Sequence, residues 1–329
     1  MTIRTAGEGD IPGIIDLLRK SLGESLLPKS ETYWNWKHRE NPFGKSLVLL
    51  AEEDGNIVGV RAFMRWRWMN GDRQYEALRA VDTATHPRNQ GKGVFRTLTL
   101  KLVDECAAAG LHFIFNTPNK YSLPGYLSMG WVEAGRQRVR IGPTAGVVLV
   151  WSGLRKAKIL EPGVAFEVAA MDQFATKLGH LVNAHNQEIA GMLVTSLSFT
   201  YLRWRYEQVP VVRYYWLNDL DKDASFCLFF RVKQTRFGTE ARITDFLVST
   251  ARLNRAFLLD QLRGLKSAVD YISAEGFTPA VNRLLSLAGF TPALPVGPRV
   301  TLRNLNLEKS SFLSNFDLWR PTLGDLELF

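Results

Sequence analysis

Apolar residues in the first part of the chain follow strand-like and helix-like patterns in turn. Two stretches rich in apolar and β-branched residues, Ser46 to Glu53 and Ile57 to Trp68, flank Asp54-Gly55-Asn56, a sequence typical of turns, which predicts a hairpin. Shorter stretches of similar character predict further strands at Ile3–Ala6, Leu78–Thr85, Phe113–Asn116 and Val132–Ile141.

Three helices are predicted between these strands. The first begins at Asp10, which stands in an N-cap position two residues before Pro12, and has an apolar face. The second is aromatic and spans Tyr33 to Pro42, which we interpret as a lid over the sheet. The third begins at Gly93 and ends near Gly110, because Val94, Leu98, Leu102 and Val103 recur at helical spacing.

The second half of the chain repeats the order of these elements. Phe166–Asp172 matches the first strand, Tyr201–Tyr206 the aromatic helix, Ala224–Lys233 the hairpin and Arg242–Val248 the strand before the third helix. Trp36 and Asp82 are 46 residues apart, and Trp204 and Asp245 are 41 apart. Order and spacing are kept while identity is mostly lost, which favours an old duplication of the whole unit.

A glycine-bearing turn connects the strand at Leu78–Thr85 to the third helix. Gly91 and Gly93 precede the helix, and Arg88, Lys92 and Arg96 add positive charge. Free amide groups at a helix N-terminus attract anions, and glycine lets a phosphate approach the backbone. The alternative is a tight strand-to-helix connection. The sequence has no P-loop, and Arg96 stands where a dinucleotide fingerprint has its third glycine.

The motif Arg88-x-x-Gly91-x-Gly93 resembles the acyl-CoA turn, [Q/R]-x-x-G-x-[G/A], of the GCN5-related N-acetyltransferase (GNAT) superfamily. Downstream, Asn119, Tyr126 and Gly130-Trp131 keep the intervals of that family's N-x(6)-Y-x(3)-G-[F/W] segment. The resemblance implies an α/β (α+β) fold, acetyl-CoA as acyl donor and transfer to an amine. The duplication resembles tandem members related to mycothiol synthase, Eis-type aminoglycoside acetyltransferases and acetyltransferases of bacterial polysaccharide clusters.

The resemblance also implies an organisation of the whole chain. We expect two tandem units, each with a mixed, mostly antiparallel sheet flanked by helices: a catalytic domain over residues 1–142, a linker over 143–163, a degenerate second domain over 164–300 and a docked tail over 301–329. Because Phe246–Asn254, the stretch directly after Asp245, contains no glycine, we expect the second unit to brace the first without binding CoA.

Carried over to this chain, the family pattern predicts the residues of the site. Tyr126 takes the place of the tyrosine that protonates the departing thiolate, and its alternative is a core tyrosine bonded to a backbone carbonyl. Tyr121 is the reserve donor. Asn119 either contacts the cofactor or caps a helix. The cofactor contacts are expected from the following residues: Thr83, Ala84, Thr85, Arg88, Asn89, Gln90, Gly91, Lys92, Gly93, Val94, Asn116 and Asn119.

Several carboxylates compete for the role of base. Asp82 lies on the strand before the turn, and its alternative is a structural partner of Arg79 or a backbone amide. Glu52, Glu53 and Glu76 are further candidates, and His86 is expected to shape the corner. In tandem relatives a C-terminal segment returns to the cleft, which adds the carboxyl groups of Asp325, Glu327 and the Phe329 terminus.

Composition limits the other possibilities. The net charge of +9 suits a phosphate-bearing donor, and the basic residues are dispersed, which argues against nucleic acid as partner. Arg61, Arg65 and Arg67 share one strand face, which we interpret as solvated; a site for an anionic substrate is the alternative. Two cysteines, Cys106 and Cys227, indicate neither disulfides nor a metal site, and the histidines lack metal-site spacing. Without a membrane span or signal sequence, we expect a cytoplasmic enzyme.

Three functions fit these observations. The first is an N-acyltransferase acting on a small polar amine, such as an amino sugar, a nucleotide-linked amino sugar or an aminoglycoside. The second is an aminoacyl-tRNA-dependent transferase, against which the glycine turn argues. The third is a non-catalytic acyl-CoA-binding protein, against which Tyr126 argues. The sequence specifies no oligomeric state.

Overall fold

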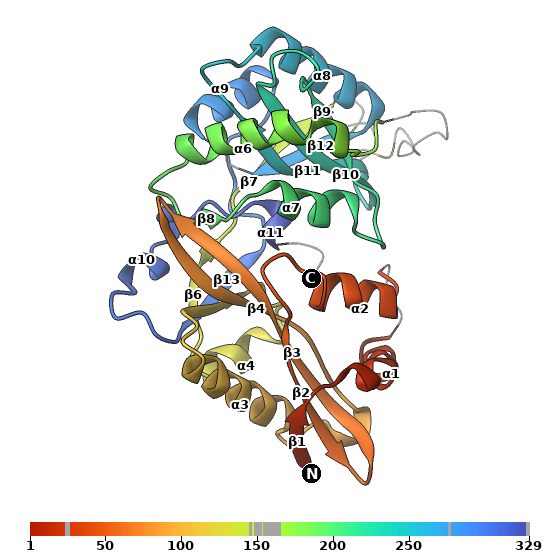
Figure 1. Ribbon diagram of the computed structural model, residues 1–329. Coiled ribbons are helices and arrows are strands. Elements are labelled where there is room, and N and C mark those ends of the chain that lie inside the picture. Colours follow the sequence, from red (N-terminus) through yellow and green to blue (C-terminus); the bar gives the residue numbers. More distant parts are fainter. Residues whose placement is uncertain (24–26, 145–146, 148–152, 154–165, 276–277, 327–329) are drawn as a thin grey trace.

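The computed structural model describes residues 1–23, 27–144, 147, 153, 166–275 and 278–326, and its strands form two mixed sheets (Figure 1). In the first sheet the strand order is β1-β2-β3-β4-β5-β13-β6, with β8 paired to β3. Its strands are β1 (Thr2–Thr5), β2 (Leu47–Glu53), β3 (Asn56–Asn70), β4 (Arg73–Thr85), β5 (Phe113–Asn116), β6 (Val132–Arg136), β8 (Val194–Thr195) and β13 (Arg299–Asn304). Among the described residues, β4–β5 is the one parallel pair of this sheet.

Helices cover both faces of the first sheet (Figure 1). They are α1 (Ile11–Leu22) and α2 (Glu31–His38) on one face, and α3 (Val94–Ala108) and α4 (Leu123–Ser128) on the other. Along β3, Val60, Ala62 and Met64 pack towards α1 and α2, while Phe63 packs towards α3. This alternation follows from the period of two in a strand. The first sheet, which contains the predicted site residues of β4, is therefore buried on both faces.

Gly59 on β3 allows α3 to lie close to the sheet. A Cβ at this position would lie 2.6 Å from Val94 Cγ1 and 3.0 Å from Leu98 Cδ1. The absence of a side chain therefore sets how deeply the first turn of α3 packs.

The second sheet has the order β7-β12-β11-β10-β9, and β11–β12 is its only parallel pair. Its strands are β7 (Val139–Pro143), β9 (Tyr215–Asn218), β10 (Phe226–Thr235), β11 (Gly238–Val248) and β12 (Tyr271–Glu275). The longer helices of this half are α6 (Ala175–Glu188), α8 (Arg255–Ala268) and α9 (Pro279–Leu287). The mixed, mostly antiparallel architecture with flanking helices is the predicted fold class.

Each sheet contains at least one strand from the half of the chain that forms most of the other sheet. β7 follows β6 after two residues but belongs to the second sheet, and β13 lies between β5 and β6 of the first. The expected boundaries at residues 142 and 300 thus fall inside β7 and β13. Hydrophobic patterns mark strands but not their partners, so this exchange is not evident from the sequence. Most of the expected linker 143–163 lies outside the described residues.

Two short elements differ from expectation. Phe166–Asp172 forms only an isolated bridge between Val168 and Tyr215, not a strand. The segment Tyr201–Tyr206 divides between α7 (Phe199–Leu202) and a π-helical turn, η4 (Arg203–Glu207). The remaining short helices are η1 (Glu8–Asp10), η2 (Pro87–Asn89), η3 (Asp172–Phe174), α10 (Ser311–Ser314), η5 (Phe316–Leu318) and α11 (Leu323–Leu326).

The tail packs between the two halves through α11, whose four residues are buried. Arg205 Nη2, from the second half, donates to the carbonyl of Gly324 at 2.8 Å. Arg79 Nη2, from β4 of the first sheet, donates to the carbonyl of Leu326 at 2.7 Å. The end of the described chain is thus bonded to both halves.

Candidate active site

A β-bulge interrupts the pairing of β3 and β4 at Asp82. Arg61 pairs with Thr83 and Ala62 with Val81, so Asp82 is the extra residue. Its φ is 32°, which is unusual for a residue with a side chain. The bulge directs the Asp82 side chain towards α2, where it meets Lys37 and His38.

Beside the bulge, β4 and β5 separate. Their parallel pairing ends with Arg79 opposite Phe115, whereas the pairing of β5 with β13 on its other edge continues to Asn116. We call the region after this point the β4–β5 opening. It leaves Ala80–Thr85 paired with β3 but without a strand partner on the β5 side among the described residues.

The glycine turn lies at the end of this opening, between β4 and α3. Gly91 and Gly93 have φ of 76° and 80°, and a Cβ on either would meet no atom within 4 Å. Gly93 is the N-cap of α3 and has no side chain that could bond the amide groups of the first turn. Exposed amide groups without a capping side chain, in a left-handed turn that favours glycine, fit a phosphate group. The turn therefore suits the pyrophosphate of CoA.

The side chains of the turn divide into exposed and structural ones. Arg88, Gln90 and Lys92 are exposed, whereas Asn89 is buried and donates to Glu53 at 2.7 Å. His86 accepts from the Arg88 amide and shapes the corner.

The predicted asparagines have partners within the protein. Asn116 Oδ1 accepts from Thr301 at 2.6 Å, which joins β5 to β13. Asn119 Oδ1 accepts from the amides of Tyr121 and Ser122 at 2.9 and 3.0 Å, just before α4. Asn119 thus orders the turn before α4, whose N-cap is Ser122. Tyr121, the reserve donor, is 81% exposed.

Tyr126 lies buried on α4, on the face of the sheet that α3 and α4 cover. Its ring packs edge-on against Phe95 and Trp131. Its hydroxyl accepts a hydrogen bond of 2.8 Å from Arg61 Nη2. The partner is therefore a buried guanidinium and not the backbone carbonyl that a core tyrosine was expected to contact.

Arg61 corrects the interpretation of the arginine row as a solvated face. Its side chain is fully buried, while Arg65 and Arg67 are partly exposed. The reason is that α3 and α4 cover this part of the face, next to the bulge. A residue type and its spacing do not show which part of a strand a helix will cover.

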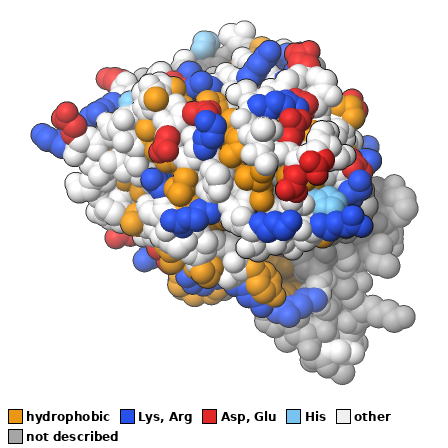
Figure 2. Space-filling view, turned by 90° about the horizontal axis from the view of Figure 1, so that it is seen from below, with side chains coloured by type: hydrophobic (Ala, Val, Ile, Leu, Met, Phe, Trp, Pro, Cys, Tyr) orange, Lys and Arg blue, Asp and Glu red, His pale blue; other side chains and the backbone are white. Residues whose placement is uncertain are grey.

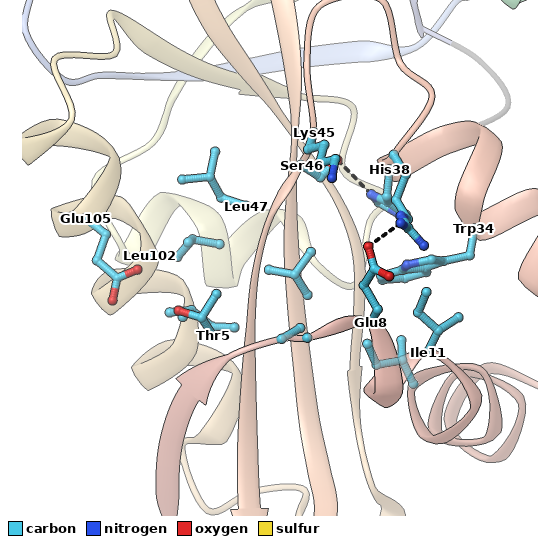
Figure 3. A pocket seen from close by; sticks show the side chains of 16 residues that line it. Thr5, Glu8, Ile11, Trp34, His38, Lys45, Ser46, Leu47, Leu102 and Glu105 are labelled. Atoms are coloured by element: carbon cyan, nitrogen blue, oxygen red, sulfur yellow. Dashed lines mark hydrogen bonds and ion pairs between the residues drawn. The ribbon is translucent and has the colours of Figure 1, made fainter.

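On the other face of the sheet, the Asp82 carboxylate contacts two buried basic side chains. Its Oδ2 lies 2.6 Å from Lys37 Nζ and 2.8 Å from His38 Nε2. His38 Nδ1 lies 2.8 Å from Ser46 Oγ. Figure 3 shows the His38 ring beside Ser46 at a pocket of about 380 Å³, which Trp34, Lys45 and Glu8 also line. Sequence reasoning missed this contact, because Lys37 and His38 lie 45 and 44 residues from Asp82.

These contacts shift the pKa values of Asp82, Lys37 and His38. Burial raises the pKa of Asp82, but Lys37 and His38 outweigh burial, so the pKa lies below its usual value. Burial lowers the pKa of Lys37 and of His38, and Asp82 opposes this in both. Asp82 is therefore ionised, and a carboxylate so stabilised is a weak base.

The other base candidates have structural partners. Glu52 pairs with Arg4 at 2.6 Å, Glu53 bonds Asn89, and Glu76 pairs with Arg67 at 2.8 Å. Asp325 is fully buried and accepts from Tyr201 at 3.2 Å and from the Thr322 amide at 2.7 Å. Glu327 and Phe329 lie outside the described residues.

The second sheet has a similar bulge but no glycine turn. Phe229 pairs with Asp245 and Phe230 with Ile243, so Thr244, and not Asp245, occupies the bulge. Asp245 bonds Tyr206, and burial together with neighbouring Asp325 raises the pKa of Asp245 to about 7. The sequence comparison matched Asp245 to Asp82, but the bulge of the second sheet lies one residue before Asp245.

Other kinds of site find no support in the described residues. They contain no group of three or more His, Cys, Asp or Glu side chains placed to hold a metal ion. None of the helices they form has the length and apolar character needed to span a membrane. On the face seen in Figure 2, Lys and Arg side chains occur together with Asp and Glu side chains.

Comparisons with known proteins agree with this geometry. Residues 2–134 match the family described as acetyltransferase (GNAT) domain. An L-methionine sulfoximine/L-methionine sulfone acetyltransferase of Salmonella typhimurium is 28% identical over 145 residues, which are 40% of this chain and 80% of that protein. An L-amino acid N-acyltransferase of Escherichia coli is 34% identical over 104 residues, which are 30% of this chain and 57% of that protein.

Solved structures resemble both halves. A GCN5-related N-acetyltransferase from Anabaena variabilis has a TM-score of 0.64 at 16% identity, over 93% of this chain and 73% of that one. Eis1 from Mycobacterium abscessus has a TM-score of 0.56 at 16% identity, over 94% of this chain and 75% of that one. At this identity the likeness concerns the fold.

Residues 2–134 therefore form a GNAT acetyltransferase domain. The protein is an N-acetyltransferase of this type, and its acyl donor is acetyl-CoA.

Proposed function

We propose that the chain transfers the acetyl group of acetyl-CoA to the primary amine of a small polar acceptor at the β4–β5 opening. The observation that carries this proposal is the order of features after Arg79. The strands separate, the bulge follows at Asp82, and the glycine turn comes next. When bound there, acetyl-CoA supplies an acyl group activated as a thioester.

The main chain would provide most of the donor contacts. The amides of Gly91, Lys92 and Gly93 and of the first turn of α3 would hold the pyrophosphate, and Arg88 and Lys92 would add charge. Amide groups of Thr83–Thr85 would hold the pantetheine arm and polarise the carbonyl, because β4 has no strand partner on this side among the described residues.

Tyr126 is proposed as the general acid. Arginine has only donors, so the bond from Arg61 occupies a lone pair of Tyr126 Oη and leaves the hydroxyl hydrogen available. The hydroxyl has no other partner among the described residues. It can therefore donate its proton to the departing sulfur as the carbon–sulfur bond breaks.

Asp82 is proposed to attract the acceptor amine. Both of its contacts are made by Oδ2, and the side chain is 22% exposed, so Oδ1 is the oxygen that an ammonium group would meet. Its lowered pKa keeps the charge in place but argues against a role as the final proton acceptor. In this proposal the proton of the amine passes from Asp82 to water.

The acceptor class rests on two supports. The two relatives compared above carry names that specify amino acids, and they match at most 40% of this chain, within the length of the first half. The tail lies beside the opening, where Leu326 contacts Arg79, and Arg205 of the second half contacts the tail at Gly324. We therefore propose a polar acceptor whose pocket both halves build, with amino sugars and aminoglycosides as the first class and amino acids as the second.

Thiol release from acetyl-CoA, measured across amino acids, amino sugars, aminoglycosides and peptides, tests this proposal. We expect turnover on at least one small amine, and the Tyr126→Phe variant to lose roughly 100-fold or more of kcat. CoA binding without turnover on any amine would favour the non-catalytic alternative.

A further inference from the structure

Arg61 is buried, and two of its guanidinium nitrogens lack a hydrogen-bond partner among the described residues. Its side chain is fully buried, and Nη2 donates to Tyr126. Nε and Nη1 are buried as well and have no hydrogen-bond partner in the described part of the chain. Within the same residues no carboxylate forms an ion pair with this guanidinium. A buried charge in this state reduces stability.

Aromatic rings surround the guanidinium without neutralising it. Its Cζ lies 4.8 Å from the ring centre of Phe63, 5.6 Å from that of Phe95 and 5.4 Å from that of Tyr126. These contacts are favourable for a cation, but they would accept an apolar side chain equally well. Within the described part of the chain, no anion balances this positive charge.

The place of Arg61 indicates the anion that would balance this charge. The residue lies on β3 directly opposite Thr83, beside the bulge, and next to the hydroxyl of Tyr126. We propose that Arg61 stabilises the negative charge that develops at the leaving sulfur of CoA, both through its hydrogen bond to the Tyr126 hydroxyl and by its own positive charge. This inference rests on the proposed role of Tyr126.

The step balances as follows. The acceptor nitrogen forms its bond to the carbonyl carbon and loses a proton to water by way of Asp82, and the carbon–sulfur bond breaks with its electron pair on sulfur. Tyr126 gives the hydroxyl proton to sulfur, and its phenolate oxygen then lies 2.8 Å from Arg61 Nη2 until water returns a proton. Arg61 lowers the energy of both anions in turn, so it is a positioning residue that acts through Tyr126.

Binding of the product tests this without turnover. CoA and desulfo-CoA differ in the thiol, whose ordinary pKa is near ~8.5. We expect the affinity of the wild-type protein for CoA to rise relative to desulfo-CoA between pH 7 and 9, roughly tenfold if the bound thiol loses one pKa unit. The Arg61→Met variant should show the same ratio at every pH.

Kinetics separates the catalytic effect from a structural one. We expect Arg61→Met to lower kcat by roughly 100-fold with little change in KM for acetyl-CoA, because general acid–base assistance has about this size. Its Tm should equal or exceed that of the wild type, since an unpaired buried charge is removed. Arg61→Lys, which keeps the charge, should recover part of kcat. In the Tyr126→Phe background, Arg61→Met should lower kcat by much less than in the wild type, because only the direct effect on the sulfur remains.

The outcomes distinguish the two proposals. If Tyr126→Phe loses kcat while Arg61→Met keeps both kcat and the pH-dependent preference for CoA, the inference about Arg61 is overturned and the role of Tyr126 stands. If Tyr126→Phe keeps kcat, the role of Tyr126 fails. A parallel loss of Tm and kcat in Arg61→Met, without recovery by lysine, would overturn the inference in favour of a structural role.

Discussion

His38 Nε2 lies 2.8 Å from Asp82 Oδ2, so the last residue of α2 is bonded to the bulge of β4. The contact is buried and joins a helix to the strand that carries the glycine turn. It also orients the charge that we assign to acceptor binding.

The first prediction concerns this contact. His38→Leu should lower kcat/KM for the acceptor roughly tenfold or more, since a lost hydrogen bond to a charged group is worth about 1.5–3 kcal/mol. His38→Gln, whose amide nitrogen takes the place of Nε2, should keep most of the activity. The Kd for CoA should stay the same in both, because the His38 ring contacts Asp82, Ser46 and Trp34, which lie outside the turn. A changed Kd with unchanged acceptor kinetics would contradict the assignment.

The second prediction concerns pH. The pKa of Asp245 is raised to about 7, chiefly by burial, so the folded protein keeps a proton that the unfolded chain loses near its ordinary value of 3.8. The stability that this group contributes is complete below pH 3.8 and is lost as pH rises towards 7. The Asp245→Asn variant does not titrate at this position.

The measurement is the difference in Tm between Asp245→Asn and the wild type. Groups that do not interact with Asp245, such as His185, occur in both proteins and cancel. Burial and, after it, the charge of Asp245 raise the pKa of Glu275, so the response of that neighbour forms part of the measured difference. We expect the difference to shift in favour of the variant between pH 4 and 7 and to level off above pH 7. A difference that is constant over this range would show that Asp245 is not protonated in the folded protein.

The third prediction concerns the tail. Deleting residues 325–329 removes Asp325, which Tyr201 and the Thr322 amide contact, and Leu326, which Arg79 contacts. We expect a Tm lower by several degrees, because buried groups lose their partners. Deleting residues 327–329 alone keeps Asp325 and Leu326 with the contacts named above, and we expect a Tm close to that of the wild type.

The same pair of deletions tests the rival bases. If turnover by the 327–329 deletion equals that of the wild type, neither Glu327 nor the Phe329 terminus accepts the proton of the amine. A loss of turnover at unchanged Tm would move that role from Asp82 and water to the tail.

Local features of the sequence predicted much of the fold. The strand Phe113–Asn116, the hairpin around Gly55 and the helix after Gly93 agree with the structure to within a few residues. Each is specified by residues close together in the chain, through turn chemistry or periodicity. The exchange of β7 and β13 depends on which strand edges meet in space, and no local pattern encodes it.

The candidate site was predictable to the same degree. The glycine turn and Tyr126 belong to one short stretch with fixed spacings. The burial of Arg61 depends on the packing of α3 and α4, and the contact of Asp82 with Lys37 and His38 crosses 44 residues. Contacts of this kind arise from tertiary packing, so residue types alone did not indicate them.

The fourth prediction addresses the central claim, that the CoA pyrophosphate binds the turn at Gly91 and Gly93. Gly91→Glu places a negative charge where the phosphates would lie, and we expect the affinity for CoA to fall by roughly 100-fold or more. Gly71→Glu is the matched control, because Gly71 is also exposed, has a φ of 57° and has no atom within 4 Å of a built Cβ.

Calorimetric titration of CoA into the wild type, Gly91→Glu and Gly71→Glu is the most direct measurement. The account predicts one CoA per chain for the wild type and Gly71→Glu with equal Kd, and little or no binding for Gly91→Glu. Equal affinity of Gly91→Glu and the wild type for CoA would contradict the claim.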